Sequence, residues 1–134
     1  MHIKKILTVD DYPLAAYTVR KIIEAFSTHK CEIKDFDSPL ELLSVFEEDP
    51  ESIDMVVTDF EMPQLRGDEL IKRLRELKPD IKIVVISAWL DSTSKDNQCL
   101  VEKEVKNLEP DLICSKPFPD NWIELLDEIL GGKE

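Results

Sequence analysis

The chain has 134 residues, of which 43% are hydrophobic, and a formal net charge of −12 at pH 7. This length suits one domain with its own core, so we expect a single domain over residues 1–134. The acidity disfavours direct binding to nucleic acid or to an anionic membrane. Because we find neither a membrane-span-length apolar run nor a secretory signal, we expect a cytoplasmic protein. Three cysteines without CxxC spacing indicate buried free thiols, not a disulfide framework or a zinc site.

Short apolar runs predict the strands of a parallel sheet. They cover residues 6–9, 53–58, 83–86 and 112–115. Runs that are hydrophobic on both faces are typical of buried central strands. Residues 31–36 instead alternate polar and apolar side chains, which favours an edge strand.

Between the strands, apolar residues at three- and four-residue spacing predict amphipathic helices. The inward stripes are Ala15, Val19, Ile22, Ile23 and Phe26; Leu42, Leu43 and Phe46; Leu70, Ile71, Leu74 and Leu77; and Trp122, Leu125, Leu126, Ile129 and Leu130. Pro13 suits the start of the first helix, and Asp37-Ser38-Pro39 suits the start of the second. A weaker stripe lies within residues 100–108. His2 and His29 have no partner pattern and are expected to be exposed.

Five successive strand–helix repeats predict an α/β fold. We expect a flavodoxin-like, doubly wound, five-stranded parallel sheet with helices on both faces. In the order 2-1-3-4-5, the first and third strands are neighbours at the switch point, where ligands bind.

Polar residues end four of these runs. Asp10 and Asp11 follow the first, Asp59 and Ser87 follow the runs at 53–58 and 83–86, and Lys116 follows the last. Because the carboxyl ends of parallel strands share one edge, these side chains are expected to converge.

Clustered carboxylates repel one another in a partly desolvated pocket, by roughly a few kcal/mol per pair. A hard divalent cation with oxygen ligands, such as Mg²⁺, would offset this repulsion. Lys116 would supply a permanent positive charge. Taken singly, each residue could instead be a solvated turn, a helix cap or an ordinary surface charge.

With this constellation, the chain resembles the receiver domain of two-component response regulators. The matching segments are Asp10-Asp11, Asp59-Phe60-Glu61-Met62-Pro63 with Gly67 beyond it, Ser87-Ala88, and Lys116-Pro117-Phe118. Each segment is weak alone, but all four in order at strand ends form a specific signal.

The resemblance implies a phosphoacceptor signalling switch in a two-component phosphorelay. Asp59 would accept a phosphoryl group from a histidine kinase or phosphotransfer protein, and Ser87 and Lys116 would contact the phosphoryl oxygens. Asp10, Asp11, Asp59 and the backbone carbonyl of Glu61 would bind Mg²⁺. The signal would pass to a downstream protein, and the chain would catalyse only its own phosphorylation and dephosphorylation, so it is not otherwise an enzyme. A homodimer, and an output domain in a longer parent protein, are left open.

The chain departs from the family pattern in its last third. Ile113 stands where receivers often have a switching aromatic residue, and the segment 89–110 is longer than usual. Trp89, just past Ser87, either packs on a loop or screens the phosphoryl group from water.

Two other functions remain open at this point. One is a receiver-like scaffold that is not phosphorylated in the cell. The other is a Mg²⁺-dependent phosphohydrolase with an aspartyl-phosphate intermediate, which the absence of a DxD motif at the first strand disfavours. The cognate kinase, the target and the stimulus do not follow from the sequence.

Overall fold

The computed structural model describes residues 3–10, 12–59, 65, 67–87, 112–115 and 122–131. In chain order its elements are β1 (Lys4–Val9), α1 (Pro13–Phe26), β2 (Cys31–Phe36), α2 (Pro39–Glu48), a 3₁₀ helix (Pro50–Ser52), β3 (Met55–Asp59), α3 (Gly67–Leu77), β4 (Lys82–Ser87), β5 (Leu112–Ser115) and α5 (Trp122–Leu130). Each helix in these ranges is too short or too polar to cross a lipid bilayer.

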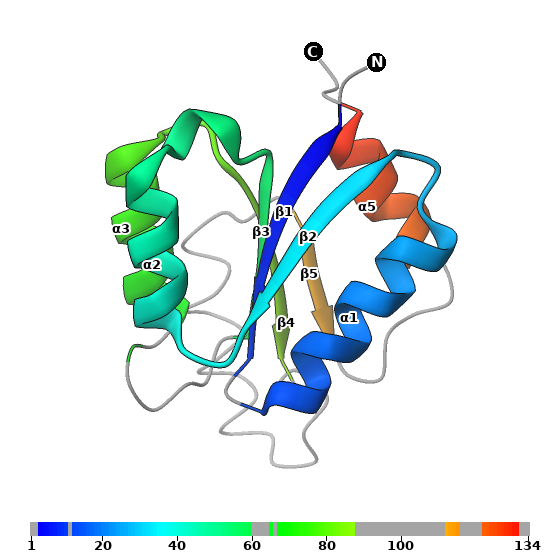
Figure 1. Cartoon of the computed structure of the whole chain (residues 1–134), viewed down its shortest axis with the longest axis horizontal. Helices are drawn as coiled ribbons and strands as arrows, with labels where there is room; N and C mark the ends of the chain where they lie inside the picture. Colours follow the sequence, from blue (N-terminus) through cyan, green and yellow to red (C-terminus); the bar gives the residue numbers. More distant parts are fainter. Residues whose placement is uncertain are drawn as a thin grey trace.

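The strands form one parallel sheet in the order β2-β1-β3-β4-β5. Helices α2 and α3 cover one face, and α1 and α5 cover the other (Figure 1). This arrangement confirms the flavodoxin-like, doubly wound fold, and β2 is the edge strand that its alternation predicted.

Each face of the sheet has its own hydrophobic core, and β1 contributes to both. Leu7 packs in the cluster that contains Leu42 and Leu74 of α2 and α3. Ile6 packs in the cluster that contains Ile23 and Leu126 of α1 and α5. Successive strand side chains point to opposite faces, so a strand covered by helices on both sides must be apolar at nearly every position.

The predicted starts of the first two helices are confirmed, because α1 begins at Pro13 and α2 at Pro39. Ser38 caps α2, because its hydroxyl oxygen accepts a hydrogen bond from the backbone N–H of Glu41 at 3.4 Å. Pro39 and Pro13 occupy the first turns of α2 and α1, where a missing N–H leaves no helical bond unmade.

Two residues of the predicted inward stripes are exposed. Phe26 has 68% of its surface in solvent and Leu77 has 39%. Each is the last residue of its helix, α1 and α3 respectively. Helical periodicity identifies the inward face, but it does not tell where the covering layer ends.

The prediction that His29 is exposed is wrong. His29 is half-buried, and its Nε2 forms a 3.1 Å hydrogen bond with the backbone carbonyl oxygen of Asp127 in α5. The Asp127 carboxylate also accepts hydrogen bonds from Ser27 Oγ at 2.6 Å, from Thr28 N at 3.0 Å and from Thr28 Oγ1 at 3.1 Å. These contacts, which we call the α5 anchor, tie the last turn of α5 to the turn between α1 and β2.

Cys31 is a free thiol, as predicted, but it is only half-buried. Burial raises the pKa of this thiol above its ordinary value of 9.0, and a hydrogen bond with Ser27 partly opposes the increase. At neutral pH the thiol is therefore protonated and weakly nucleophilic.

Candidate functional site

Two acidic side chains meet at the carboxyl edge of the sheet. Asp10 directly follows β1, and Asp59 is the last residue of β3. The two strands are neighbours in which Val9 pairs with Thr58, so the carboxylates occupy the next position along both strands. Asp10 is 6% exposed and Asp59 is 8% exposed. The structure thus brings together two residues that the sequence analysis assigned to one site, and we call them the acid pair.

Local hydrogen bonds fix the backbone around the acid pair. The N–H of Asp10 donates to the carbonyl oxygen of Phe36 in β2 at 3.2 Å. The N–H of Tyr12 donates to Asp10 Oδ1 at 3.0 Å, just before α1 begins. Thr58 Oγ1 donates to the carbonyl oxygen of Asp59 at 2.7 Å. The acid pair is therefore held by the sheet and by the first turn of α1, and not by a free loop.

A small hollow lies between the acid pair and helix α1. Besides Asp10 and Asp59, its wall includes Ala16 and Val19 of α1 and the side chain of Thr8. Most of the wall is apolar, so the effective dielectric constant there is lower than in water and the two carboxylates repel each other more strongly. Such an arrangement favours a positive charge between the carboxylates.

Ser87 ends β4, the strand next to β3. Asp59 pairs with Ile86, so Ser87 is one position further along the neighbouring strand. Ser87 itself pairs with Ser115, the last residue of β5. Lys116 follows Ser115 in the sequence. The backbone order thus places Ser87 at the same edge as the acid pair.

The remaining predicted site residues lie outside the described part of the chain. These are Asp11, Glu61 and Lys116, together with Trp89 and the segment 89–110. Ile113 lies in β5, opposite Val85. Within the described ranges no group of three or more His, Cys, Asp or Glu side chains is arranged to bind a metal ion. At this edge of the sheet these ranges supply the two carboxylates of the acid pair.

Sequence reasoning missed two buried hydroxyl groups beside the acid pair. Thr8 is 1% exposed and Thr58 is 0% exposed. Each stands inside an apolar run, one or two positions before the acidic residue that ends it. A threonine within a run of aliphatic residues was the signal that could have identified both.

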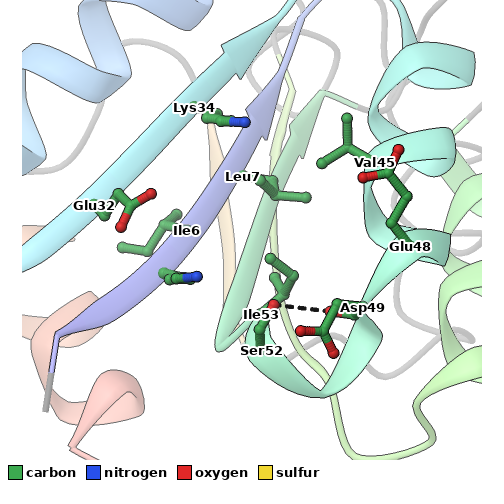
Figure 2. A pocket seen from close by; sticks show the side chains of 10 residues that line it. Ile6, Leu7, Glu32, Lys34, Val45, Glu48, Asp49, Ser52 and Ile53 are labelled. Carbon is green, nitrogen blue, oxygen red and sulfur yellow. Dashed lines mark hydrogen bonds between the residues drawn. The ribbon is translucent and has the colours of Figure 1, made fainter.

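A second hollow, of about 200 Å³, lies away from the acid pair, near the amino ends of β1 and β3 (Figure 2). Its walls carry lysines of β1 and β2 and carboxylates of β2 and α2, and Ser52 Oγ donates to the carbonyl oxygen of Asp49 beside it. The volume is below the roughly 300–1,000 Å³ of ordinary small-molecule pockets. Because its charges are of both signs, we do not assign it to the acidic site.

The sheet order and the helices on both faces define the class of doubly wound α/β proteins, and comparison with known proteins identifies the family. The family model "Response regulator receiver domain" matches residues 6–120. The chain therefore belongs to the response regulator receiver domain family.

Curated relatives include plant and bacterial signalling proteins. The two-component response regulator ORR1 of Oryza sativa is 33% identical over 93 residues, which cover 64% of this chain and 40% of that protein. ORR5 of the same species is 28% identical over 120 residues, covering 83% of this chain and 86% of that protein. Chemotaxis protein CheV1 of Helicobacter pylori is 27% identical over 127 residues, covering 93% of this chain and 37% of that protein. The chain thus spans about two fifths of the length of ORR1 and of CheV1.

Solved structures agree on the fold. A CheY-like response regulator receiver domain protein from Methanospirillum hungatei aligns with a TM-score of 0.73 and 24% identity, covering 98% of this chain and 96% of that one. The receiver domain of the Francisella response regulator 1452 aligns with a TM-score of 0.75 and 24% identity, covering 98% and 99%.

Proposed function

We propose that this chain is a phosphoryl-dependent switch in which Asp59 accepts the phosphoryl group. The observation that supports this role most directly is the acid pair, two nearly buried carboxylates at the ends of neighbouring strands. A buried carboxylate at a rigid strand end is a well-positioned nucleophile. Membership of the receiver family agrees with this role.

The acid pair fits a hard divalent cation, because Mg²⁺ prefers oxygen ligands and needs only one or two carboxylates. In our proposal the side chains of Asp10, Asp11 and Asp59 and the backbone carbonyl of Glu61 hold Mg²⁺. When bound, the ion neutralises charge on the acid pair and on the phosphoryl oxygens.

The transfer step itself requires little of the protein beyond positioning and charge neutralisation. A carboxylate oxygen of Asp59 attacks phosphorus, and the P–N bond of a donor phosphohistidine breaks with its electron pair remaining on the imidazole nitrogen. Ser87 donates a hydrogen bond to one phosphoryl oxygen, and Lys116 pairs with another. The donor is a histidine kinase or a phosphotransfer protein.

The resulting acyl phosphate adds negative charge at one end of the sheet, and the changed surface is read by a downstream protein. We place this exchange in the cytoplasm, because a free thiol such as that of Cys31 persists in a reducing compartment. Apart from its own phosphorylation and dephosphorylation, the chain has no catalytic role in this proposal.

Intact-mass measurement after incubation with a small phosphodonor and Mg²⁺ tests the proposal. We expect one added phosphoryl group on the wild-type chain and none on Asp59→Asn. Asp80→Asn is the matched control, because Asp80 is an exposed carboxylate in the turn before β4. Continuous release of phosphate from a phosphomonoester would favour the phosphohydrolase alternative. Absence of labelling on every variant would favour the unphosphorylated scaffold.

A further inference from the structure

The hydroxyl group of Thr8 is buried without a hydrogen-bond partner among the described residues. Thr8 is the last residue but one of β1, and only 1% of its surface is exposed. Buried polar atoms in folded proteins almost always have a partner, either protein or ordered water. The Thr8 hydroxyl therefore needs a hydrogen-bond partner that the described protein groups around it do not supply.

The surroundings of Thr8 would suit valine better. Ala16, Val19, Val57 and Ile86 line the same hollow with aliphatic groups. Valine has nearly the same shape as threonine but carries no hydroxyl, so it would fill this place without the penalty of burying an unpaired polar group. The contrast with Thr58 is informative, because the Thr58 hydroxyl donates to the carbonyl oxygen of Asp59 at 2.7 Å.

The hollow connects Thr8 with the acid pair. Alternate residues of a strand share a face, so Thr8 and Asp10 lie on the same side of the sheet, and Asp59 lines the same hollow from β3. The space is large enough for about one water molecule, and a buried water needs two to four polar partners. The Thr8 hydroxyl and the two carboxylates are three such partners.

We propose that Thr8 holds a single buried water molecule beneath the acid pair and is a positioning residue of the site. The Thr8 hydroxyl donates to the water oxygen, and the water donates its two hydrogens to the carboxylates of Asp10 and Asp59. This arrangement gives the Thr8 hydroxyl a partner and stays within the ordinary donor and acceptor capacity of all three groups. It rests on the proposed function in one respect, namely that the acid pair binds Mg²⁺.

The consequence is an effect on metal binding without a direct contact to the metal. Groups that orient metal ligands from behind typically change metal affinity by about 10- to 100-fold when they are removed. For one water-mediated contact we expect the lower end, so Thr8→Val should raise the Kd for Mg²⁺ by about ten-fold. Thr8→Ser, which keeps the hydroxyl and loses only a methyl group, should stay within about three-fold of wild type.

The experiment combines a crystal structure with calorimetric titration of Mg²⁺ into the wild-type chain, Thr8→Val and Thr8→Ser. We expect an ordered water within hydrogen-bond distance of Thr8 Oγ1 in the wild type and its loss in Thr8→Val. Without Mg²⁺, we also expect Thr8→Val to unfold at the same temperature as the wild type or higher, because valine suits the apolar wall. This measurement distinguishes weaker metal binding from misfolding.

Two results would overturn the inference. One is a wild-type crystal structure in which Thr8 Oγ1 contacts no water, and the other is a Thr8→Val variant that binds Mg²⁺ as tightly as the wild type. If the wild type bound no Mg²⁺ at all, the proposed function would be refuted. The crystal structures would still show whether the buried water exists. If the wild type bound Mg²⁺ and was labelled on Asp59 while Thr8→Val behaved identically, the role of Thr8 alone would fail.

Discussion

Replacing Asp127 by alanine is expected to lower the free energy of unfolding by about 1–2 kcal/mol, because it removes the carboxylate of the α5 anchor. That carboxylate accepts three hydrogen bonds from Ser27 and Thr28, with lengths of 2.6, 3.0 and 3.1 Å. Hydrogen bonds to a charged group are worth roughly 1.5–3 kcal/mol each at best.

The net value is smaller here for two reasons. Thr28 is exposed, so water competes for its donors and about 0.5–1 kcal/mol per bond is a better figure. Alanine is also a better helix former than aspartate, which returns roughly 0.5 kcal/mol at a helical position. The sum leaves the loss of about 1–2 kcal/mol stated above.

Urea denaturation followed by circular dichroism measures this loss. With a slope of about 2 kcal/mol per molar urea, the middle of the usual range, the midpoint should move down by about 0.5–1 M. Glu128→Ala is the control, because Glu128 is exposed on the next position of the same helix and should change the midpoint little. Equal midpoints for Asp127→Ala and Glu128→Ala would show that the α5 anchor does not contribute to stability.

Three further predictions concern other parts of the fold. Ser38→Ala should cost about 1 kcal/mol of stability, because it removes the cap of α2; chemical denaturation measures it, and a loss below about 0.3 kcal/mol would contradict the assignment. Asp59→Asn should raise the unfolding temperature in Mg²⁺-free buffer by relieving repulsion within the acid pair, whereas the exposed Asp80→Asn should not, and equal shifts would argue against a strained pair. The raised pKa of Cys31 predicts that its alkylation in the folded chain has a pH midpoint above 9.0, measured by peptide mapping. Because the folded pKa exceeds the unfolded one, the free energy of unfolding should also decrease as the pH rises above about 9, and a midpoint below 9.0 would contradict the burial effect.

The sheet and the acid pair could be predicted because they depend on local patterns and one topological rule. Each buried strand is an apolar run that stops at a polar residue, and parallel strands place those stops at a common edge. Asp10 and Asp59 therefore came together in the prediction as they do in the structure. The strand order 2-1-3-4-5 was expected as that of a flavodoxin-like, doubly wound sheet, and the structure has it.

The α5 anchor could not be predicted in this way. His29 and Asp127 are 98 positions apart, and neither stands in a pattern that marks a contact. Their meeting depends on how far α5 extends along α1, which is decided by the packing of Trp122, Leu126 and Leu130 against the sheet. Phe26 illustrates the same limit, because its place in an apolar stripe did not reveal that the last residue of α1 is exposed to solvent.

The position of the acid pair on β1 and β3 makes it depend on the pairing of two strands that are separated in the sequence. In the sheet, β2 lies at the edge and β3 lies on the other side of β1. In the chain, β1, α1, β2 and α2 all come before β3. A nascent chain still lacking β3 has Asp10 without its neighbour. The acid pair is thus a property of the paired β1 and β3, and neither strand carries it alone.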